Sequence, residues 1–121
     1  MSKRILVVED QEDNRQIVRD LLVASGYELV EATTGEEGIA LAERERPDLI
    51  LMDIQLPGLD GYEATRRIKA NSALSHIPII AVTSYALSGD DQKAFAAGCD
   101  GYVTKPFSPR QLLAKIREYL K

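Results

Sequence analysis

Leu49-Ile50-Leu51-Met52-Asp53 is the stretch that decides the fold, because four apolar residues in a row lead directly into a carboxylate. Such a short run without polar alternation is typical of a strand that is buried on both faces of a parallel sheet. Residues 5–8 and 79–82 have the same character. The sequence therefore predicts three inner strands of one parallel sheet.

Two further strands and a set of helices complete the predicted order. Residues 28–32 alternate in polarity like a half-exposed edge strand, and residues 101–104 fit a short fifth strand. Between the first two strands, apolar residues share one helical face until Gly26, where a helix can end. Residues 89–97 give a weaker helical pattern that stops at Gly98.

Capping residues mark the start of the remaining three helices. Each predicted N-cap is followed three residues later by Glu or Gln, which is the capping-box pattern. The pairs are Thr34 with Glu37, Asp60 with Glu63, and Ser108 with Gln111. Strand and helix thus alternate five times, which predicts an α/β fold: a doubly wound (βα)5 parallel five-stranded sheet with strand order 2-1-3-4-5.

Polar residues at the ends of the predicted strands converge at one edge of this sheet. Strands one and three are neighbours where the winding reverses, and ligands of such sheets bind in the crevice at that point. Glu9 and Asp10 end strand one, and Asp53 ends strand three. A single acidic strand end is more often a solvated loop carboxylate, but acidic residues at two adjacent strand ends favour a binding site.

The chemistry of this cluster points to a cation and a phosphoryl group. At an effective dielectric of about 20, two carboxylates about 4 Å apart repel each other by about 4 kcal/mol. Mg²⁺ offsets this repulsion with few direct protein ligands, here expected to be Asp10 and Asp53. Lys105 and Thr83, which follow strands five and four, add an ammonium and a hydroxyl for phosphoryl oxygens.

The expected nucleophile is the carboxylate of Asp53. No Gly-rich phosphate loop follows the first strand, and the lone His76 lies in a connection, where we expect it on the surface. A carboxylate in this position can form an acyl phosphate.

Length and composition predict a single cytoplasmic domain. The 121 residues, 45% of them hydrophobic, suffice for one core and leave no room for an output domain. The net charge of -4 and the pI of about 5.0 argue against direct binding of nucleic acid. One cysteine, Cys99, a polar start and no long apolar run predict a protein without disulfides, signal peptide or membrane span.

Four motifs lie at the predicted strand ends: VVED at residues 7–10, LMDIQLPGLDG at 51–61, AVTS at 81–84 and GYVTKPF at 101–107. Together they resemble the receiver domains of bacterial two-component response regulators. The resemblance covers the whole chain and is greatest to stand-alone CheY-like or DivK-like regulators and to the receiver modules of hybrid sensor kinases. It implies a flavodoxin-like, CheY-like fold and a role in two-component or phosphorelay signal transduction.

The resemblance also implies a role for each residue of the cluster. Asp53 would accept a phosphoryl group from a phosphohistidine on a sensor histidine kinase or a histidine phosphotransfer protein. Asp10, Asp53 and the backbone carbonyl of Gln55 would hold Mg²⁺, and Glu9 would act through a water on the metal. Lys105 would pair with the phosphoryl oxygens.

A switch is a further implication of the resemblance. A cis peptide between Lys105 and Pro106 would aim the lysine, in keeping with the restriction of cis bonds to X-Pro. Thr83 would move towards the phosphoryl group, and Tyr102 would follow inward. This change would alter the face made by the fourth helix, the fifth strand and the fifth helix, and with it the affinity for a partner.

Gln55 and Tyr85 would flank the phosphoryl group, with Tyr85 hindering the attacking water. Such a protein is not an enzyme acting on other substrates, because it catalyses only its own phosphorylation and autodephosphorylation. Its downstream partner would be a protein that the sequence does not specify. It would act away from the membrane, as a monomer or as a weak, phosphorylation-dependent homodimer.

Two other functions compete with this one. A Mg²⁺-dependent aspartyl-phosphate phosphatase of the haloacid-dehalogenase-like kind carries Asp-x-Asp after its first strand, whereas this chain has EDQE at residues 9–12 and its acceptor after strand three. A flavodoxin-type redox carrier needs a hydroxyl-rich, phosphate-binding first loop. The acidic first loop argues against it.

Overall fold

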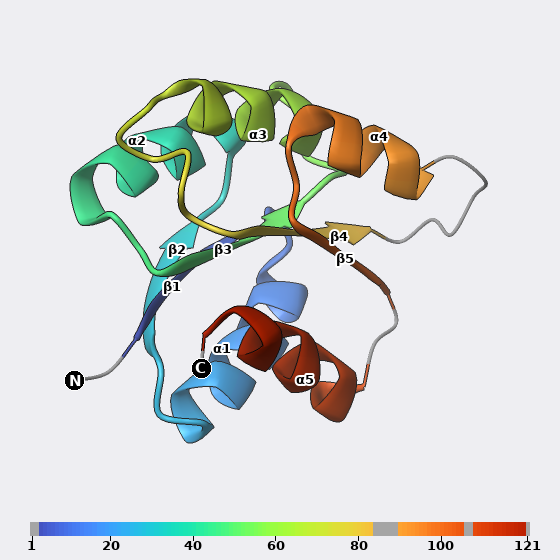
Figure 1. The fold of residues 1–121 in the computed structure, drawn as a ribbon. Coiled ribbons are helices and arrows are strands. Elements are labelled where there is room, and N and C mark those ends of the chain that lie inside the picture. Colours follow the sequence, from blue (N-terminus) through green and yellow to red (C-terminus); the bar gives the residue numbers. More distant parts are fainter. Residues whose placement is uncertain (1–2, 84–89, 106–107, 121) are drawn as a thin grey trace.

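Strands and helices alternate along the whole chain (Figure 1). The computed structural model describes residues 3–83, 90–105 and 108–120. The elements are β1 (Arg4–Val8), α1 (Glu12–Ala24), β2 (Glu28–Ala32), α2 (Gly35–Glu45), β3 (Leu49–Asp53), α3 (Gly61–Ala70), β4 (Ile79–Thr83), α4 (Asp90–Ala97), β5 (Gly101–Thr104) and α5 (Pro109–Tyr119).

The five strands form one parallel sheet in the order β2-β1-β3-β4-β5. In register, Ile5 lies opposite Leu49 across β1 and β3, and Ile50 lies opposite Ile79 across β3 and β4. The predicted doubly wound fold and its strand order are therefore confirmed. β1 and β3, which carry the acidic residues, are hydrogen-bonded neighbours at the point where the winding reverses.

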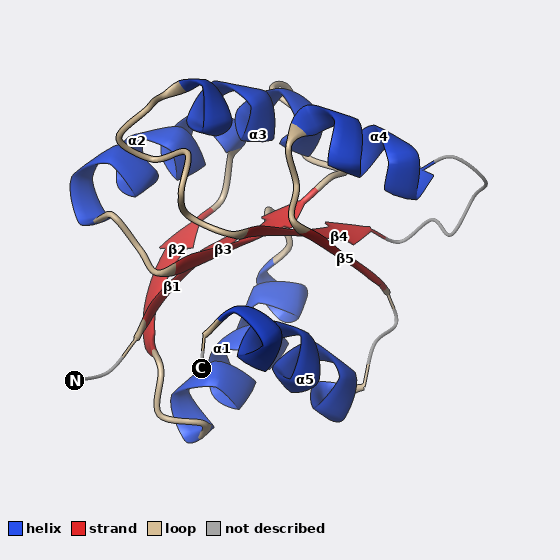
Figure 2. Cartoon of the chain, viewed as in Figure 1, coloured by secondary structure: helices blue, strands red, loops and turns tan. Residues whose placement is uncertain are grey.

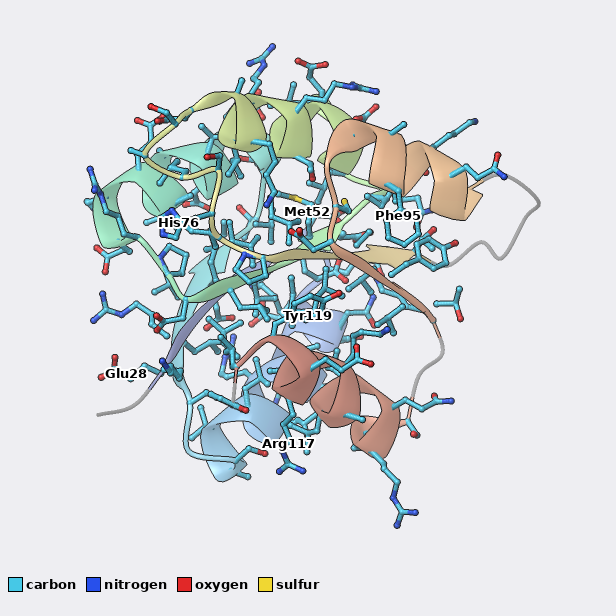
Figure 3. All side chains as sticks on the ribbon, in the orientation of Figure 1. Glu28, Met52, His76, Phe95, Arg117 and Tyr119 are labelled. Carbon is cyan, nitrogen blue, oxygen red and sulfur yellow. The ribbon has the colours of Figure 1, made fainter. Side chains whose placement is uncertain are left out.

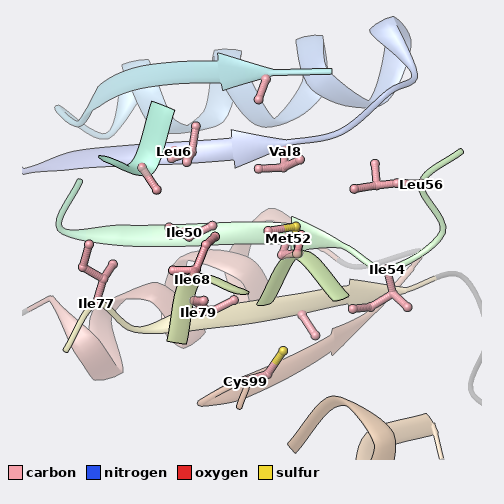
Figure 4. Packing of buried hydrophobic residues seen from close by; sticks show 14 of the residues in the cluster. Leu6, Val8, Ile50, Met52, Ile54, Leu56, Ile68, Ile77, Ile79 and Cys99 are labelled. Atoms are coloured by element: carbon pink, nitrogen blue, oxygen red, sulfur yellow. The ribbon is translucent and has the colours of Figure 1, made fainter. Parts of the chain in front are cut away.

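Helices cover both faces of the sheet, with α2, α3 and α4 on one face and α1 and α5 on the other (Figure 2). Every residue of β3 and β4 is buried, which explains why their sequences are apolar without alternation. Figure 4 shows the cluster on the α3 side, where Leu6, Ile50 and Met52 pack with Ile68. A second cluster, which includes Leu112 of α5, fills the opposite face.

The predicted N-caps are present, but only one forms the full capping box. Ser108 accepts a hydrogen bond from the Gln111 N–H, and the Gln111 side chain accepts one from the Ser108 N–H. Thr34 accepts from the Glu37 N–H, whereas the Glu37 carboxylate accepts from the N–H of Thr33, one residue before the cap.

At α3, Asp60 caps the helix by accepting from the Glu63 N–H. The Glu63 carboxylate pairs with Arg66 and Arg67 on its own helix and not with the cap. The competing arginines, three and four residues further on, are the reason why the predicted box is incomplete.

The helix and strand boundaries agree with the predicted ones to about one residue. Gly26 follows α1 with a φ of 89°, the left-handed conformation expected of a glycine that ends a helix. β2 is a partly exposed edge strand, as its alternation indicates. Within the described ranges, no helix is long and apolar enough to cross a bilayer.

The first turn of α3 lies directly against the end of β3. A Cβ atom built on Gly61 would lie 2.3 Å from the main-chain oxygen of Asp53 and 2.7 Å from the Cα of Ile54. The Gly61 N–H also donates to the Ile54 carbonyl at 3.1 Å. Any side chain at residue 61 would therefore push the backbone of Asp53 out of place.

We expect Gly61→Ala to lower the free energy of unfolding by about 3 kcal/mol, because the added methyl overlaps main-chain atoms that cannot rotate away. Gly58→Ala is the matched control: Gly58 has a φ of 72° and no heavy atom within 4 Å of an added Cβ, so only backbone strain of about 1 to 2 kcal/mol applies. Urea denaturation of both variants measures the difference. Equal losses would contradict the steric account.

Candidate functional site

Three carboxylates gather at the carboxyl ends of β1 and β3. Glu9, Asp10 and Asp53 each present an oxygen, and these oxygens all lie within 4.8 Å of one another. Glu9 and Asp53 are each only 5% exposed, and Asp10 is half-buried. The convergence expected from the strand ends is present, because parallel pairing of β1 with β3 brings the residues after both strands to one edge.

Lys105 places its ammonium against the two buried carboxylates. Its Nζ lies 2.7 Å from Glu9 Oε1 and 3.5 Å from Asp53 Oδ2. The Lys105 N–H donates to the carbonyl of Thr83 at 2.6 Å, which holds the residue after β5 beside the end of β4. Pairing of the strands thus brings together Glu9 and Lys105, which are 96 positions apart in the sequence.

Burial dominates the electrostatics of Glu9. Loss of water around the side chain raises the pKa of Glu9 above its usual value of 4.5, and the neighbouring Asp53 raises this pKa further. The ammonium of Lys105 opposes both effects without cancelling them. Three carboxyl groups thus meet a single lysine at this edge of the sheet, within the described residues.

This donor set fits a hard divalent cation. All the side chains that converge offer carboxylate oxygens, which are the ligands that Mg²⁺ prefers, and a cation would offset the charge that Lys105 leaves. No soft sulfur or imidazole ligand belongs to the group. Glu9, Asp10 and Asp53 are the described residues whose oxygens could hold such an ion.

The loop after β3 ties Asp53 to the end of β4. The Gln55 N–H donates to Asp53 Oδ1 at 3.0 Å, and the Ile54 N–H donates to the Val82 carbonyl at 3.0 Å. The side-chain amide of Gln55 donates from Nε2 to the hydroxyl of Thr83, which is only 1% exposed. Gln55 therefore links the hydroxyl that is predicted to act as a switch to the carboxylate of Asp53.

Tyr102 lies on β5, half-buried against the core on the side of α2, α3 and α4. A shallow groove runs along β5 and α5, lined by Tyr102, Thr104, Gln111 and Lys115 among others. On the neighbouring α4, Phe95 is 50% exposed (Figure 3). The face expected to change in the switch thus presents aromatic side chains in the described residues.

Some predicted residues fall outside the described ranges. They are Tyr85, Pro106 with its peptide bond to Lys105, and Phe107. His76, in contrast, is described and exposed, as expected for a residue of the connection before β4 (Figure 3).

Sequence reasoning missed two features beside the site. A cavity of about 460 Å³ lies between α1, α5 and the sheet, and its lining includes Ile17, Val18 and Leu112 together with Asp53. Arg15, on the first turns of α1, donates from Nη1 to the carbonyl of Glu9 at 3.1 Å. The only signal for this hydrogen bond in the sequence was an arginine six residues after Glu9. Periodicity alone does not distinguish such an arginine from one that points into solvent.

The family model for the response regulator receiver domain matches residues 5–117. The chain belongs to this family. As a receiver domain it is a module of two-component signal transduction, and the resemblance stated from its motifs is confirmed. The phosphatase alternative is not favoured by this result.

Relatives and solved structures agree with the assignment. The polar-differentiation response regulator DivK of Brucella anthropi is 46% identical over 120 residues, which are 99% of this chain and 98% of that protein. The receiver domain of the sensor histidine kinase PA1611 of Pseudomonas aeruginosa is 38% identical with a TM-score of 0.92, covers 99% of this chain and 98% of its own, and has a magnesium ion coordinated in its active-site cleft. The chemotaxis protein CheY4 of Vibrio cholerae is 30% identical with a TM-score of 0.93 and covers 98% and 99% of the two chains.

We expect Lys105→Met to lower the free energy of unfolding by about 2 kcal/mol at neutral pH in metal-free buffer, because a charge-assisted hydrogen bond to a buried carboxylate is lost. Since the folded state raises the pKa of Glu9, the contribution of Glu9 to stability falls as the pH rises from 4.5 through the raised pKa. In the variant this contribution should fall further over the same pH range, because Lys105 no longer opposes the rise in the pKa of Glu9.

The matched control is Lys115→Met on α5, where the lysine pairs with the exposed Glu118. This substitution should cost at most about 0.5 kcal/mol. Chemical denaturation between pH 4.5 and pH 8, with a chelator present, measures both effects. A Lys105→Met protein as stable as the control at every pH would contradict the account of the site.

Proposed function

We propose that Asp53 accepts a phosphoryl group from a phosphohistidine of a sensor histidine kinase or a histidine phosphotransfer protein, in a Mg²⁺-dependent reaction. The observation that carries this proposal is the meeting of Glu9, Asp10 and Asp53 with Lys105 at one edge of the sheet of a receiver domain. Asp10, Asp53 and the main-chain carbonyl of Gln55 would hold the ion directly, and Glu9 through a water.

The chain's own groups account for the steps of the transfer. A carboxylate oxygen of Asp53 forms a bond to phosphorus while the phosphorus–nitrogen bond to the imidazole breaks, and the imidazole keeps that electron pair. The Gln55 N–H fixes the orientation of the Asp53 carboxylate. Lys105 moves from Glu9 to the phosphoryl oxygens, whose charge it offsets. Bound Mg²⁺ supplies the remaining neutralisation of phosphoryl charge.

The output is a change of surface. The Thr83 hydroxyl turns towards the phosphoryl group, Tyr102 moves inward, and the face of α4, β5 and α5 changes its affinity for a protein partner. We propose that the protein is not an enzyme for other substrates and catalyses only its own phosphorylation and autodephosphorylation. Tyr85 would slow the second reaction by hindering water.

We also propose that the protein is cytoplasmic and that this receiver domain does not bind nucleic acid directly. The free, buried Cys99 suits a reducing compartment, and the net charge of -4 suits protein partners better than phosphate backbones. The protein would be a monomer or form a weak homodimer when phosphorylated.

Incubation of the protein with acetyl phosphate and Mg²⁺ should add one phosphoryl group, seen by intact mass analysis. Asp53→Asn should abolish the gain, because an amide is no nucleophile, and a chelator should abolish it in the wild type. Asp20→Asn, on the exposed side of α1, is the control that should label normally. Labelling that survives Asp53→Asn would overturn the proposal, and multiple turnover of a phosphate ester would favour the phosphatase.

Gln55→Ala should make the switch easier to operate. The amide hydrogen bond to Thr83 must break before the hydroxyl can turn, and a bond of about 1 kcal/mol corresponds to about a fivefold change in an equilibrium. We expect the variant to reach the switched form, with Thr83 turned and Tyr102 moved inward, at about a fivefold lower concentration of beryllium fluoride. The amide NMR resonances of β5 follow this change. Thr83→Ala should not switch at any beryllium fluoride concentration. An unchanged titration midpoint for Gln55→Ala would contradict this role of the hydrogen bond from Gln55 to Thr83.

A further inference from the structure

The two peptide groups that flank the Glu9 Cα, one before it and one leading to Asp10, are each held by a hydrogen bond. On one side, the Glu9 N–H donates to the carbonyl of Ala32 at 3.0 Å, which extends the pairing of β1 with β2 by one residue. On the other side, the Glu9 carbonyl accepts a hydrogen bond from Arg15 Nη1 at 3.1 Å. Both polar groups of Glu9's backbone are therefore fixed just before Asp10.

Arg15 is itself held by its position and its partners. Its N–H donates to the Gln11 carbonyl at 3.0 Å, within the first turn of α1. Its side chain is only 12% exposed, and Nε lies 3.3 Å from Glu31 Oε1 on β2. A guanidinium suits this place, because separate nitrogens in one rigid plane meet the carbonyl and the carboxylate together.

Glu31 is kept charged and in place by a second arginine. Arg19 binds it through two bonds, Nε to Oε2 at 3.0 Å and Nη2 to Oε1 at 2.8 Å. The hydrogen bonds from Arg19 are the main reason why the pKa of Glu31 lies below its usual value. A connected chain thus runs from Arg19 through Glu31 and Arg15 to the Glu9 carbonyl.

This chain of hydrogen bonds ends on the carbonyl oxygen of Glu9, which belongs to the same peptide group as the Asp10 nitrogen. A peptide group is planar, so fixing the Glu9 carbonyl also fixes the plane that contains the Asp10 nitrogen and Cα. The Asp10 side chain is built on the N–Cα axis in this plane, so a rotation of the plane would displace the Asp10 carboxylate. Arg15 donates to the main chain of Glu9, while Lys105 pairs with the Glu9 carboxylate.

We propose that Arg15 is a positioning residue for the cation site, which holds the Glu9–Asp10 peptide so that Asp10 meets the ion in the right orientation. The inference rests on the proposed Mg²⁺ site. It assigns a function to a residue of α1 whose side chain bonds to the Glu9 main chain and to Glu31, and to none of the three clustered carboxylates.

Charge and geometry predict opposite effects of removing Arg15. A guanidinium near the site repels Mg²⁺, so by charge alone its removal would tighten binding of the ion. If the guanidinium mainly fixes the peptide, its removal weakens binding. Loss of a partner that orients a metal ligand typically costs about tenfold or more in affinity.

The test is an amide NMR titration of the full chain with Mg²⁺ alone. We expect Arg15→Gln to bind Mg²⁺ about tenfold more weakly than the wild type. Arg15→Lys keeps the charge but not the two-nitrogen geometry, and should weaken binding by a smaller factor. Arg66→Gln is the matched control: it removes the same charge from a helix, but Arg66 pairs with Glu63 on α3 and has no bond to Glu9 or Glu31, so the variant should bind as the wild type does.

Thermal unfolding in chelator shows whether each variant is folded. A folded Arg15→Gln protein that binds Mg²⁺ as tightly as the wild type, or more tightly, would overturn the inference. Should Arg15→Gln fail to fold, Arg15→Lys decides, and unchanged affinity there has the same meaning. A wild type that shows no Mg²⁺-dependent shifts near Asp10 and Asp53 would overturn the metal site and this inference with it.

Discussion

The repulsion between the carboxylates of Glu9 and Asp53 governs the rest of the site. The two are held together because β1 and β3 are paired by hydrogen bonds, and both are buried, so water screens them poorly. The position of Lys105 and the fit to a divalent cation follow from that enforced proximity. Burial is the main reason why the pKa of Glu9 is raised, and the nearby Asp53 raises it further. The sheet supplies the free energy that holds like charges side by side.

Two supports from opposite faces of the sheet hold the acidic loops. On the face of α1, the guanidinium of Arg15 contacts the carbonyl of Glu9. On the face of α3, Gly61 lets the helix approach the main chain of Asp53. Main-chain atoms are contacted in both cases, which leaves the carboxylate oxygens available to a ligand. Each loop is thereby set by the helix that packs beside it.

The strand ends could be predicted from the sequence because a buried parallel strand has a plain signature and the fold brings all its carboxyl ends to one edge. Lys105 was therefore placed near Glu9 in spite of their distance in the chain. Two hydrogen bonds could not be predicted: the one from the Gln55 side-chain amide to the Thr83 hydroxyl, and the one from Arg15 to the Glu9 carbonyl. These depend on side-chain rotamers and on the rotation of a helix against the sheet, neither of which hydrophobic periodicity encodes.

The close approach at Gly61 has a mechanical consequence. With no space between α3 and the carbonyl of Asp53, the end of β3 and the start of α3 behave as one stiff body. Strain that arises at Asp53 cannot relax into its own backbone. Under the proposed function, side chains across the sheet would respond instead, at Thr83 on β4 and at Lys105 after β5. The lack of a Cβ at residue 61 thus makes the end of the strand and the start of the helix a single mechanical unit.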